Sequence, residues 1–599
     1  MFQTFDSTAM PEQGPPRLAA LRKELTARGL SGFIVPRADV HQGEYVAVRD
    51  ERLRWLTSFT GSAGFCIALP DVAGVFIDGR YRTQIKGQVD LKVFTPVPWP
   101  EVKPGDWLRE HLSAGRVGFD PWLHTADEIE KLERALEGSG ISAVAVDANP
   151  IDLLWTDAPA PHIGKAFVHP EALAGESSGA KRARLAQDLR SAGQKVAVLT
   201  LPDSICWLLN IRGDDVPKNP VLHAFALLGD DARLTLYTNP AKLDAEVRAH
   251  IGAEVAIRPI ETFASDLAGL SGVVRVDKAS APLAVSTILR KAGAEVQWGD
   301  DPCRLPKARK NAAEIQASRE AHLRDGAAMA EFLCWLDNEA PKGGLTEISV
   351  VQALEGFRRA TNALHNISFD TISCAGPNGA IMHYRVTEET NRPVRSGELF
   401  LVDSGAQYQD GTTDITRTIA IGDPGEEARA CYTRVLQGLI AVSRVRFPKG
   451  LPGRDIDSLA RFPLWLAGQD FDHGTGHGVG SFLSVHEGPQ RISRVSEIPL
   501  EPGMILSNEP GYYREGAFGI RLENLMVVED ALPLGDNRPQ LSFETLTWVP
   551  FDRRLVLAAE LAPGERTWLN GYHAAVLEKL APRVTKDTLD WLRAACAPI

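Results

Sequence analysis

The sequence predicts an α/β protein of several domains, in which two related smaller α/β domains precede a larger C-terminal domain of mixed (α+β) type. The 599 residues exceed what a single hydrophobic core supports. A helix–glycine–strand order occurs near the N-terminus and again near residue 190. From about residue 307 onward, helical and strand-like segments alternate and carry the clustered polar motifs.

The composition excludes several classes of protein. Hydrophobic residues make up 44% and charged residues 24% of the chain, as in ordinary globular proteins. The net charge of -12 disfavours binding to nucleic acid or to an anionic membrane surface. Neither an apolar run of about 18 residues nor the apolar core of a signal peptide is visible, so we expect no membrane span and no secretion. Seven scattered cysteines without a CxxC pattern favour a reducing cytoplasm.

Each of the two α/β units begins with a helix, a capping glycine and a buried strand. In the first unit the glycine is Gly29 and the strand covers residues 32–35. In the second unit Gly193 precedes a strand at residues 196–199. Leucines at helical spacing mark the two helices: Leu18, Leu21 and Leu25, then Leu185 and Leu189. Further strand-like runs cover residues 65–69, 75–77 and 224–228.

Changes in composition predict the domain boundaries. Residues 171–180 are small and polar, which favours a linker, and Pro302 and Pro306 mark a second boundary. We therefore predict domains at residues 1–170, 171–306 and 307–599, the last with a C-terminal extension from about 540 to 599.

The third domain opens with a long helical pattern. One face of it is formed by Leu323, Ala327, Ala330 and Cys334. In the extension we expect a strand at residues 546–549 and a helix that carries Trp568, Leu569 and Tyr572.

The first candidate acids lie on a predicted hairpin. An apolar strand ends at Asp403, and the next strand-like run contains Asp414. With a tight turn at residues 410–411, Asp414 would lie opposite Gln407, about 13 Å from Asp403 at roughly 3.3 Å per residue. A shared site would need a reversal centred on residues 408–409, or a bulge. The alternative is that both acids are solvated turn residues.

Three histidines follow in a glycine-rich run, His473-Gly-Thr-Gly-His477-Gly-Val-Gly, with His486 soon after. Alternate glycines disfavour a helix and indicate backbone that something approaches closely. The spacing matches neither a phosphate-binding loop nor the HExxH zinc motif, which fails at Gln490. Three of the chain's 14 histidines within this stretch are difficult to attribute to packing alone.

Two glutamates complete the candidate set, each next to a strand-like run. Glu509 precedes Pro-Gly-Tyr-Tyr513, and Glu523 stands two residues after Arg521. Each alone is ordinary turn or ion-pair chemistry. Together with Asp403, Asp414 and His477, they supply four carboxylates and one imidazole. The negative charge of this set nearly balances the positive charge of two divalent cations. This oxygen-rich set suits Mn²⁺, Co²⁺ or Fe²⁺ at least as well as Zn²⁺.

At this point the sequence resembles the three-domain, cytosolic-type aminopeptidase P (Xaa-Pro aminopeptidase) group of the pita-bread metallopeptidase family. The resemblance covers almost the whole chain. It rests on residues 44–45, 61–65, 78–81, 207–213, 219–220, 376–380, 383–384, 402–405, 473–480, 509–513, 568–570 and 572–573. It implies a pita-bread catalytic domain behind two creatinase-like domains, and a homodimer formed through the catalytic domain.

The resemblance also implies a role for each site residue. Asp403 would bind one metal ion, Asp414 and Glu523 would bridge two ions, and His477 and Glu509 would bind the second. Glu509 would also take the proton of the attacking water. The substrate and its leaving group would be served by His383, His473 and His486, and the site would be held in place by Tyr513 and Arg521. Mn²⁺ is the preferred ion, with Zn²⁺ or Co²⁺ as alternatives.

The implied activity is release of the N-terminal residue from peptides with proline in the second position, by attack of a hydroxide held by two metal ions. The Xaa-Pro bond is a tertiary amide without an N–H, so a site that reads that N–H cannot bind it. The leaving proline nitrogen must also receive a proton. His486 is the first candidate donor and His383 the second. The alternatives are a prolidase restricted to Xaa-Pro dipeptides, a catalytically dead pita-bread module that binds peptides, and a metal-free creatinase-type hydrolase.

Overall fold

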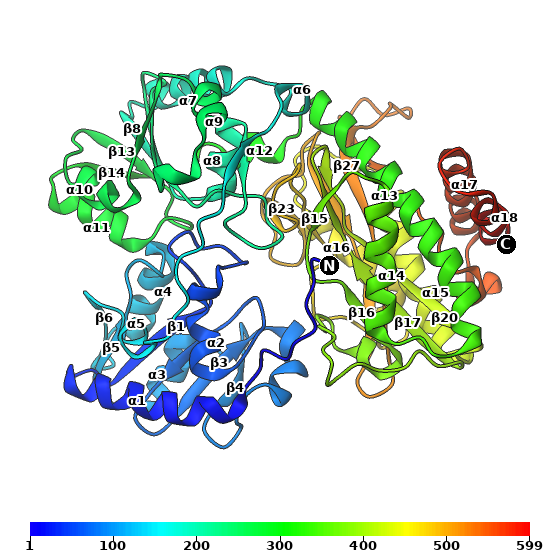
Figure 1. Cartoon of the computed structure of the whole chain (residues 1–599), viewed down its shortest axis with the longest axis horizontal. Coiled ribbons are helices and arrows are strands. Elements are labelled where there is room, and N and C mark those ends of the chain that lie inside the picture. Colours follow the sequence, from blue (N-terminus) through cyan, green and yellow to red (C-terminus); the bar gives the residue numbers. More distant parts are fainter. The chain divides into compact units, whose positions relative to one another are not determined.

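The computed structural model describes residues 1–599, which form two compact units (Figure 1). The N-terminal unit comprises residues 8–307. The C-terminal unit comprises residues 308–599 together with residues 1–7. No helix combines the length and the apolarity that crossing a membrane requires.

Two six-stranded sheets of the same topology form the N-terminal unit. The first sheet consists of β1 (Gly32–Pro36), β2 (Phe65–Ala68), β3 (Ala73–Ile77), β4 (Thr95–Pro98), β5 (Gly115–Phe119) and β6 (Ile141–Ala145). The second consists of β8 (Val196–Leu199), β10 (Phe225–Gly229), β11 (Leu234–Tyr237), β12 (Val255–Arg258), β13 (Val273–Val276) and β14 (Glu295–Trp298). Their orders, β4-β3-β2-β1-β5-β6 and β12-β11-β10-β8-β13-β14, correspond strand by strand. The predicted duplication is confirmed.

Helices with one apolar face cover these sheets. The leucines predicted to be buried are buried on α1 (Gly14–Ala27) and α7 (Ser178–Ser191). The other helices are α2 (Arg52–Thr57), α3 (Pro104–His111), α4 (Ala126–Leu136), α5 (Pro150–Leu154), α8 (Pro202–Leu209), α9 (Ala245–Ile251), α10 (Phe263–Leu267), α11 (Leu283–Lys291) and α12 (Arg304–Ala308). A short ribbon pairs β7 (Ala166–Val168) with β9 (Ile211–Gly213).

The linker expected at residues 171–180 is wrong. The segment forms α6 (Glu171–Ala174) and the start of α7. The hydroxyl of Ser177 accepts a hydrogen bond from the N–H of Ala180 and caps α7. Small polar residues are as typical of helix N-caps as of linkers, so their composition misled the prediction. The domain boundaries themselves stay predictions.

The C-terminal unit combines three sheets, one further ribbon and six α-helices. The sheets contain β15 (Leu364–Ile367), β18 (Ala406–Tyr408) and β19 (Gly411–Thr412); β16 (Ile372–Ala375), β17 (Glu398–Ser404) and β20 (Ile415–Ile421); and β21 (Phe447–Pro448), β22 (Gly476–Gly478), β23 (Glu487–Ile492), β24 (Ile505–Asn508), β27 (Asn524–Asp530) and β28 (Gln540–Thr545). The ribbon pairs β25 (Gly511–Arg514) with β26 (Phe518–Arg521). The helices are α13 (Ala312–Glu339), α14 (Glu347–Ala360), α15 (Glu426–Ser443), α16 (Arg454–Trp465), α17 (Pro563–Leu580) and α18 (Lys586–Ala595).

The long helix α13 is confirmed, but its most buried face differs from the predicted one. Leu323 and Ala327 are only half-buried. Ala330 and Cys334 are buried as predicted. The set Asp325, Met329, Phe332 and Leu336, two positions further along the sequence and so on another face, is fully buried. Asp325 is tolerated there because Arg358 donates two hydrogen bonds to it, at 2.8 and 3.0 Å. An acid inside the buried stripe interrupts the apolar periodicity from which the face was predicted.

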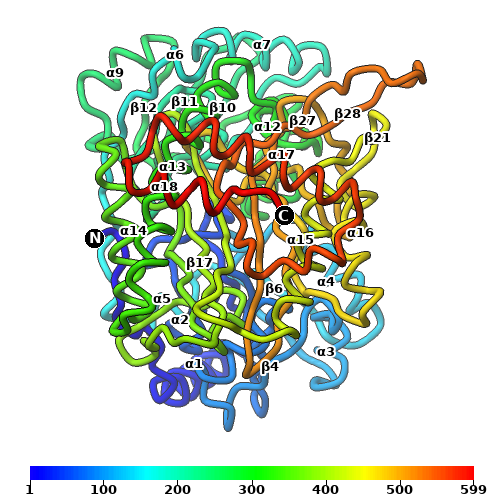
Figure 2. The backbone as a smooth tube through the Cα atoms, turned by 90° about the vertical axis from the view of Figure 1, so that its right-hand side faces the viewer, coloured from blue at the N-terminus to red at the C-terminus, as the bar shows by residue number.

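The C-terminal extension packs on the rest of its unit through α17 and α18, which cross in front of α13 and α15 in Figure 2. The helix predicted around Trp568 is confirmed as α17. The strand expected at residues 546–549 is wrong, because the strand is β28, at Gln540–Thr545. The N–H of Leu546 still donates to the carbonyl of Leu525 on β27, but the N–H of Val549 donates to the hydroxyl of Tyr572 on α17.

Candidate metal centre

The predicted hairpin exists, with its turn one residue earlier than the Asp410-Gly411 turn that we considered. Asp403 lies opposite Thr416, and Tyr408 lies opposite Gly411. The turn residues are therefore Gln409 and Asp410. Continued along the strands, this register brings Asp414 opposite Gly405, two residues from Asp403 and on the same face. The reversal at residues 408–409 that we considered necessary is therefore not formed. The turn at 409–410 still brings the donor atoms of Asp403 and Asp414 within 4.8 Å of each other.

An irregularity at Gly405 completes the convergence of the two acids. Residue 405 interrupts the strand between β17 and β18, and residues 413–414 interrupt it between β19 and β20. A Cβ at Gly405 would lie 2.0 Å from the Ser368 hydroxyl and 2.1 Å from the Thr413 carbonyl oxygen, so only glycine fits. The Ser368 hydroxyl donates to that carbonyl at 2.9 Å.

The two glutamates come from the paired ends of β24 and β27. Asn508, the last residue of β24, lies opposite Asn524, the first residue of β27. Glu509 follows β24 directly and Glu523 precedes β27 directly. The ribbon β25–β26 connects them. Pairing of the two strands therefore brings two carboxylates, 14 positions apart in the sequence, to one edge of the sheet.

His477 lies on β22, and its neighbouring glycines are required by close backbone contacts. A Cβ on Gly476 would lie 2.0 Å from the carbonyl oxygen of Ser507, and one on Gly478 would lie 2.3 Å from that of Glu487. The Nδ1 of His477 donates to the carbonyl of Gly478 at 2.9 Å. Nδ1 therefore carries the proton, and the lone pair of Nε2 is available to bind a metal ion.

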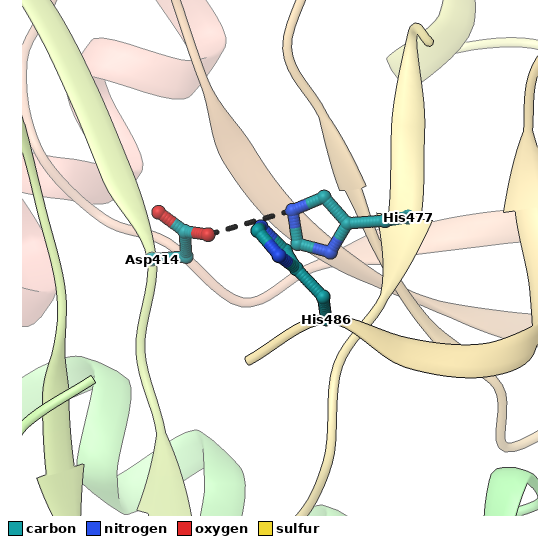
Figure 3. Close-up of side chains that lie close together, drawn as sticks. All are labelled: Asp414, His477 and His486. Carbon is teal, nitrogen blue, oxygen red and sulfur yellow. Dashed lines mark ion pairs between the residues drawn. The ribbon is translucent and has the colours of Figure 1, made fainter. Parts of the chain in front are cut away.

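The imidazole of His477 faces the acids. Its Nε2 lies 3.5 Å from Asp414 Oδ2 and 3.6 Å from Glu509 Oε1. In Figure 3, Asp414 approaches from the hairpin on one side and His477 from β22 on the other, and the ring of His486 lies beside that of His477. The ring centroids of the two histidines are 4.4 Å apart.

The donor atoms of the predicted ligands form overlapping groups, each within 4.8 Å. One group joins Asp403, Asp414 and Glu523; a second joins His477, Glu509 and Glu523; a third joins Asp414, His477 and His486. Two centres that share carboxylates fit this pattern. Glu523, Asp414 and His477 each belong to two of the groups, and the bridging role of the two carboxylates stays a prediction.

Unsatisfied oxygen atoms provide a test of whether cations fit. Asp403 Oδ1, Asp414 Oδ1 and Glu523 Oε1 are buried and have no hydrogen-bond partner. A buried carboxylate oxygen without a partner is costly, and such atoms need a cation or a proton. The cluster therefore fits two divalent cations with oxygen-rich ligands.

The electrostatics of the cluster support the same conclusion. Burial raises the pKa of Asp414 well above its usual range, and the charge of Asp403 raises it further. Burial and the charge of Asp414 likewise raise the pKa of Glu523 well above normal. Burial also raises the pKa of Glu509. Carboxylates so close together resist ionisation unless positive charge is placed among them.

Three residues form a hydrogen-bonded chain behind Asp403. Arg521 Nη2 donates to Asp403 Oδ2 at 2.7 Å, and Arg521 Nη1 donates to the Tyr513 hydroxyl at 2.6 Å. That hydroxyl lies 2.8 Å from Nε2 of His473, whose Nδ1 lies 2.8 Å from the Gly474 carbonyl. Both ring nitrogens of His473 thus have protein partners, and its predicted contact with substrate stays a prediction.

His383 lies just beyond strand β16, in the segment that follows residues 376–380. The carbonyl of its neighbour Met382 accepts from Arg521 Nη2 at 3.3 Å. Since the same guanidinium holds Asp403, the main chain beside His383 is tied to the cluster. The side-chain role of His383 stays a prediction.

Sequence reasoning missed three residues that hold the ligands. Thr416 Oγ1 donates to Glu523 Oε2 at 2.7 Å, and Arg417 Nη1 donates to the Glu523 carbonyl at 2.6 Å. The Ser507 hydroxyl accepts from the N–H of His477 at 2.9 Å and lies 3.3 Å from Glu509 Oε1. Threonine, arginine and serine on strands are ordinary, so only the observation that they stand beside predicted ligands could have identified them.

Comparisons with known proteins account for most of the chain. Residues 316–530 match Metallopeptidase family M24, and residues 539–599 match the C-terminal region of peptidase M24. Residues 17–152 and 157–314 each match a creatinase/prolidase N-terminal domain.

Individual relatives match over nearly their whole length. A probable Xaa-Pro aminopeptidase P of Talaromyces stipitatus is 38% identical over 612 residues, covering 97% of this chain and 92% of the relative. One of Aspergillus fumigatus is 39% identical over 616 residues, with the same coverages. The crystal structure of the X-prolyl aminopeptidase of Caenorhabditis elegans, described as a cytosolic enzyme with a di-nuclear active site, superposes with a TM-score of 0.94. It is 34% identical and covers 98% of this chain and 100% of the other.

Proposed function

The chain belongs to metallopeptidase family M24, and on that premise we propose that it is a metal-dependent aminopeptidase that releases the N-terminal residue from peptides with proline in the second position. The observation that carries the proposal is the convergence of the donor atoms of Asp403, Asp414, His477, Glu509 and Glu523 in overlapping groups. A dead peptide-binding module would not need this set. A metal-free hydrolase would leave the three buried carboxylate oxygens unsatisfied.

The five residues would hold two divalent ions. Asp403 would bind one ion, Asp414 and Glu523 would be shared, and His477 with Glu509 would complete the second. When bound, such ions lower the pKa of water and polarise a carbonyl oxygen. The oxygen-rich set favours Mn²⁺, with Co²⁺ or Zn²⁺ as the alternatives.

The remaining chemistry is proton transfer by this chain's own residues. Glu509 is suited to accept a proton from water, because burial raises the pKa of its carboxyl toward the working range. The leaving proline nitrogen must gain a proton. His486 is placed for this beside His477 and Asp414, and His383 is the second candidate. Arg521 and Tyr513 keep Asp403 in place without taking part in proton transfer.

The substrate assignment is tested with three peptides. We expect the enzyme to release arginine from Arg-Pro-Pro and to leave Arg-Ala-Pro intact, with free amino acids measured by chromatography. A prolidase would instead hydrolyse an Arg-Pro dipeptide and not the tripeptide. Hydrolysis of the dipeptide alone would contradict the aminopeptidase assignment.

An apolar patch on the C-terminal unit supports a homodimer. Phe462, Trp465 and Leu466 are 58%, 45% and 75% exposed at the end of α16, and Val495 beside them is 74% exposed. Arg494 reaches over the Trp465 ring, which places Val495 next to the same helix end. Clustered exposed apolar side chains are typical of an interface. We assign this patch to a second copy of the chain.

Replacing Trp465 with glutamate is expected to convert the dimer to a monomer, because a charge would be buried at the centre of the interface. Light scattering coupled to size exclusion measures the mass. Leu532→Glu is the control, since Leu532 is also an exposed apolar residue (79%) but lies outside the patch, in the loop between β27 and β28. A monomeric wild-type protein, or a dimeric Trp465→Glu variant, would refute the assignment.

We place the protein in the cytoplasm. All seven cysteines are buried, free thiols. Free thiols are the state that a reducing compartment maintains.

A further inference from the structure

The first residues of the chain belong to the C-terminal unit, although the following 300 residues form the N-terminal unit. In Figure 1 the dark blue end of the chain lies against the part of the molecule that carries α14 and β16. We call residues 2–6 the N-terminal strap. Phe2 contacts α14, where its N–H donates to Glu355 at 2.9 Å and Arg359 lies over its ring. The rest of the strap contacts two segments close to the predicted metal ligands and to His383.

The first segment is the edge of the sheet that carries Asp403. Gln3 is 3% exposed, and its side-chain amide pairs with both main-chain groups of Thr371. Its Oε1 accepts from the Thr371 N–H at 2.8 Å, and its Nε2 donates to the Thr371 carbonyl at 3.3 Å. Thr371 leads into β16, an edge strand whose residue Ile372 pairs with Asp403. The Gln3 side chain therefore satisfies the main-chain N–H and carbonyl of Thr371 at the open edge of the sheet, as a neighbouring strand would.

The second segment is the loop of residues 381–390, which contains His383. Arg385 Nη2 donates to the Thr4 carbonyl at 2.6 Å, and Arg385 Nη1 donates to the Asp6 carbonyl at 2.9 Å. The N–H of Glu388 donates to the Phe5 carbonyl at 2.9 Å. Three consecutive strap carbonyls thus accept hydrogen bonds from one loop. The Phe5 ring packs against the apolar cluster that includes Tyr384 and Val386.

These contacts complete the anchoring of His383. On its N-terminal side, the Met382 carbonyl is held by Arg521. On its C-terminal side, the Tyr384 hydroxyl donates to Glu347 at 2.9 Å, and the strap then holds Arg385. A loop fixed at both ends loses fewer conformations when it presents a side chain to substrate.

We propose that the N-terminal strap is a positioning element of the active site, which orders the loop that presents His383 to the peptide. Arg385 is the positioning residue through which the strap acts. The inference rests on the proposed function, because it takes His383 to contact the substrate or its leaving group. Removal of the strap would leave the metal ligands in place and loosen this loop.

The test uses the full-length, Mn²⁺-loaded enzyme with two variants, deletion of residues 2–6 and Arg385→Gln. In each we expect kcat/KM for Arg-Pro-Pro to fall about 10-fold, with the metal content unchanged and faster hydrogen exchange at residues 381–390. Arg385→Lys, which keeps a donor and the charge, should restore part of the loss. The control is Arg429→Gln. It removes an arginine that pairs with Asp423 and lies outside both the strap and the loop of residues 381–390.

A double-variant cycle separates positioning from general destabilisation. In a His383→Ala background, Arg385→Gln should cause no further loss of kcat/KM, because the residue being positioned is gone. Additive losses, or wild-type kinetics and wild-type exchange in Arg385→Gln, would overturn the proposal, even if the deletion variant does not fold. If His383→Ala alone is fully active, the role of His383 in the proposed function fails. Hydrogen exchange of residues 381–390 in Arg385→Gln then still tests the strap: faster exchange means that the strap orders the loop, and unchanged exchange means that it does not.

Discussion

Removal of the metal ions is expected to abolish hydrolysis of Arg-Pro-Pro, and addition of Mn²⁺ is expected to restore it. Without cations, the partnerless oxygens of Asp403, Asp414 and Glu523 have no ionic partner. Nothing else in the cluster supplies the positive charge that a developing oxyanion needs. The loss should therefore be complete within the limits of the assay.

The measurement combines exhaustive chelation, dialysis, elemental analysis and peptide hydrolysis on one preparation. Because burial raises the pKa of Asp414 and Glu523 above their usual range, protons compete with metal ions for these carboxylates more strongly than for exposed ones. The affinity for Mn²⁺ should consequently increase as pH rises through these raised pKa values. Unchanged turnover in a preparation shown to contain no metal would contradict the assignment of the centre.

Replacement of a carboxylate predicted to be shared by both ions is expected to have the second large effect on activity. Asp414→Asn and Glu523→Gln keep the size of each side chain and remove its charge. Each should lower kcat by about 10³-fold or more and release bound metal, because both predicted ions lose a ligand. Metal content by elemental analysis and initial rates on Arg-Pro-Pro measure the two effects separately.

Matched controls exist for both substitutions. Asp410→Asn alters an acid of the same hairpin, which pairs with Arg324 at 2.8 Å instead of facing the cluster. Glu529→Gln alters an exposed glutamate on the strand that follows Glu523. Both controls should retain two bound ions and nearly full activity. An Asp414→Asn enzyme with normal rate and normal metal content would remove Asp414 from the ligand set.

Local patterns predicted most of the elements that build the protein. The paired helix–glycine–strand units around Gly29 and Gly193 became two sheets of identical strand order. The glycines around His477 were correctly interpreted as positions of close backbone approach. These predictions succeeded because side-chain periodicity and the absence of a Cβ act within a few residues of the chain.

Two of the failures share one cause, which is that the deciding contact lies far away in sequence. The run at residues 546–549 has the apolar character of a strand, but the hydroxyl of Tyr572 takes the N–H of Val549. The buried face of α13 includes Asp325, because Arg358 and the Tyr408 hydroxyl reach it from other elements. No local pattern contains that information.

By itself, the sequence determined which residue types were available for the centre and which glycines the backbone requires. It also identified the family resemblance from long motifs. It did not determine that Asp403 and Asp414 meet, because this depends on whether the turn occupies residues 409–410 or 410–411. The tertiary structure has the turn at residues 409–410, with Gly405 packed closely against Ser368 and Thr413. A turn shifted by one residue changes every cross-strand partner, and only packing against distant segments makes one register more stable than the other.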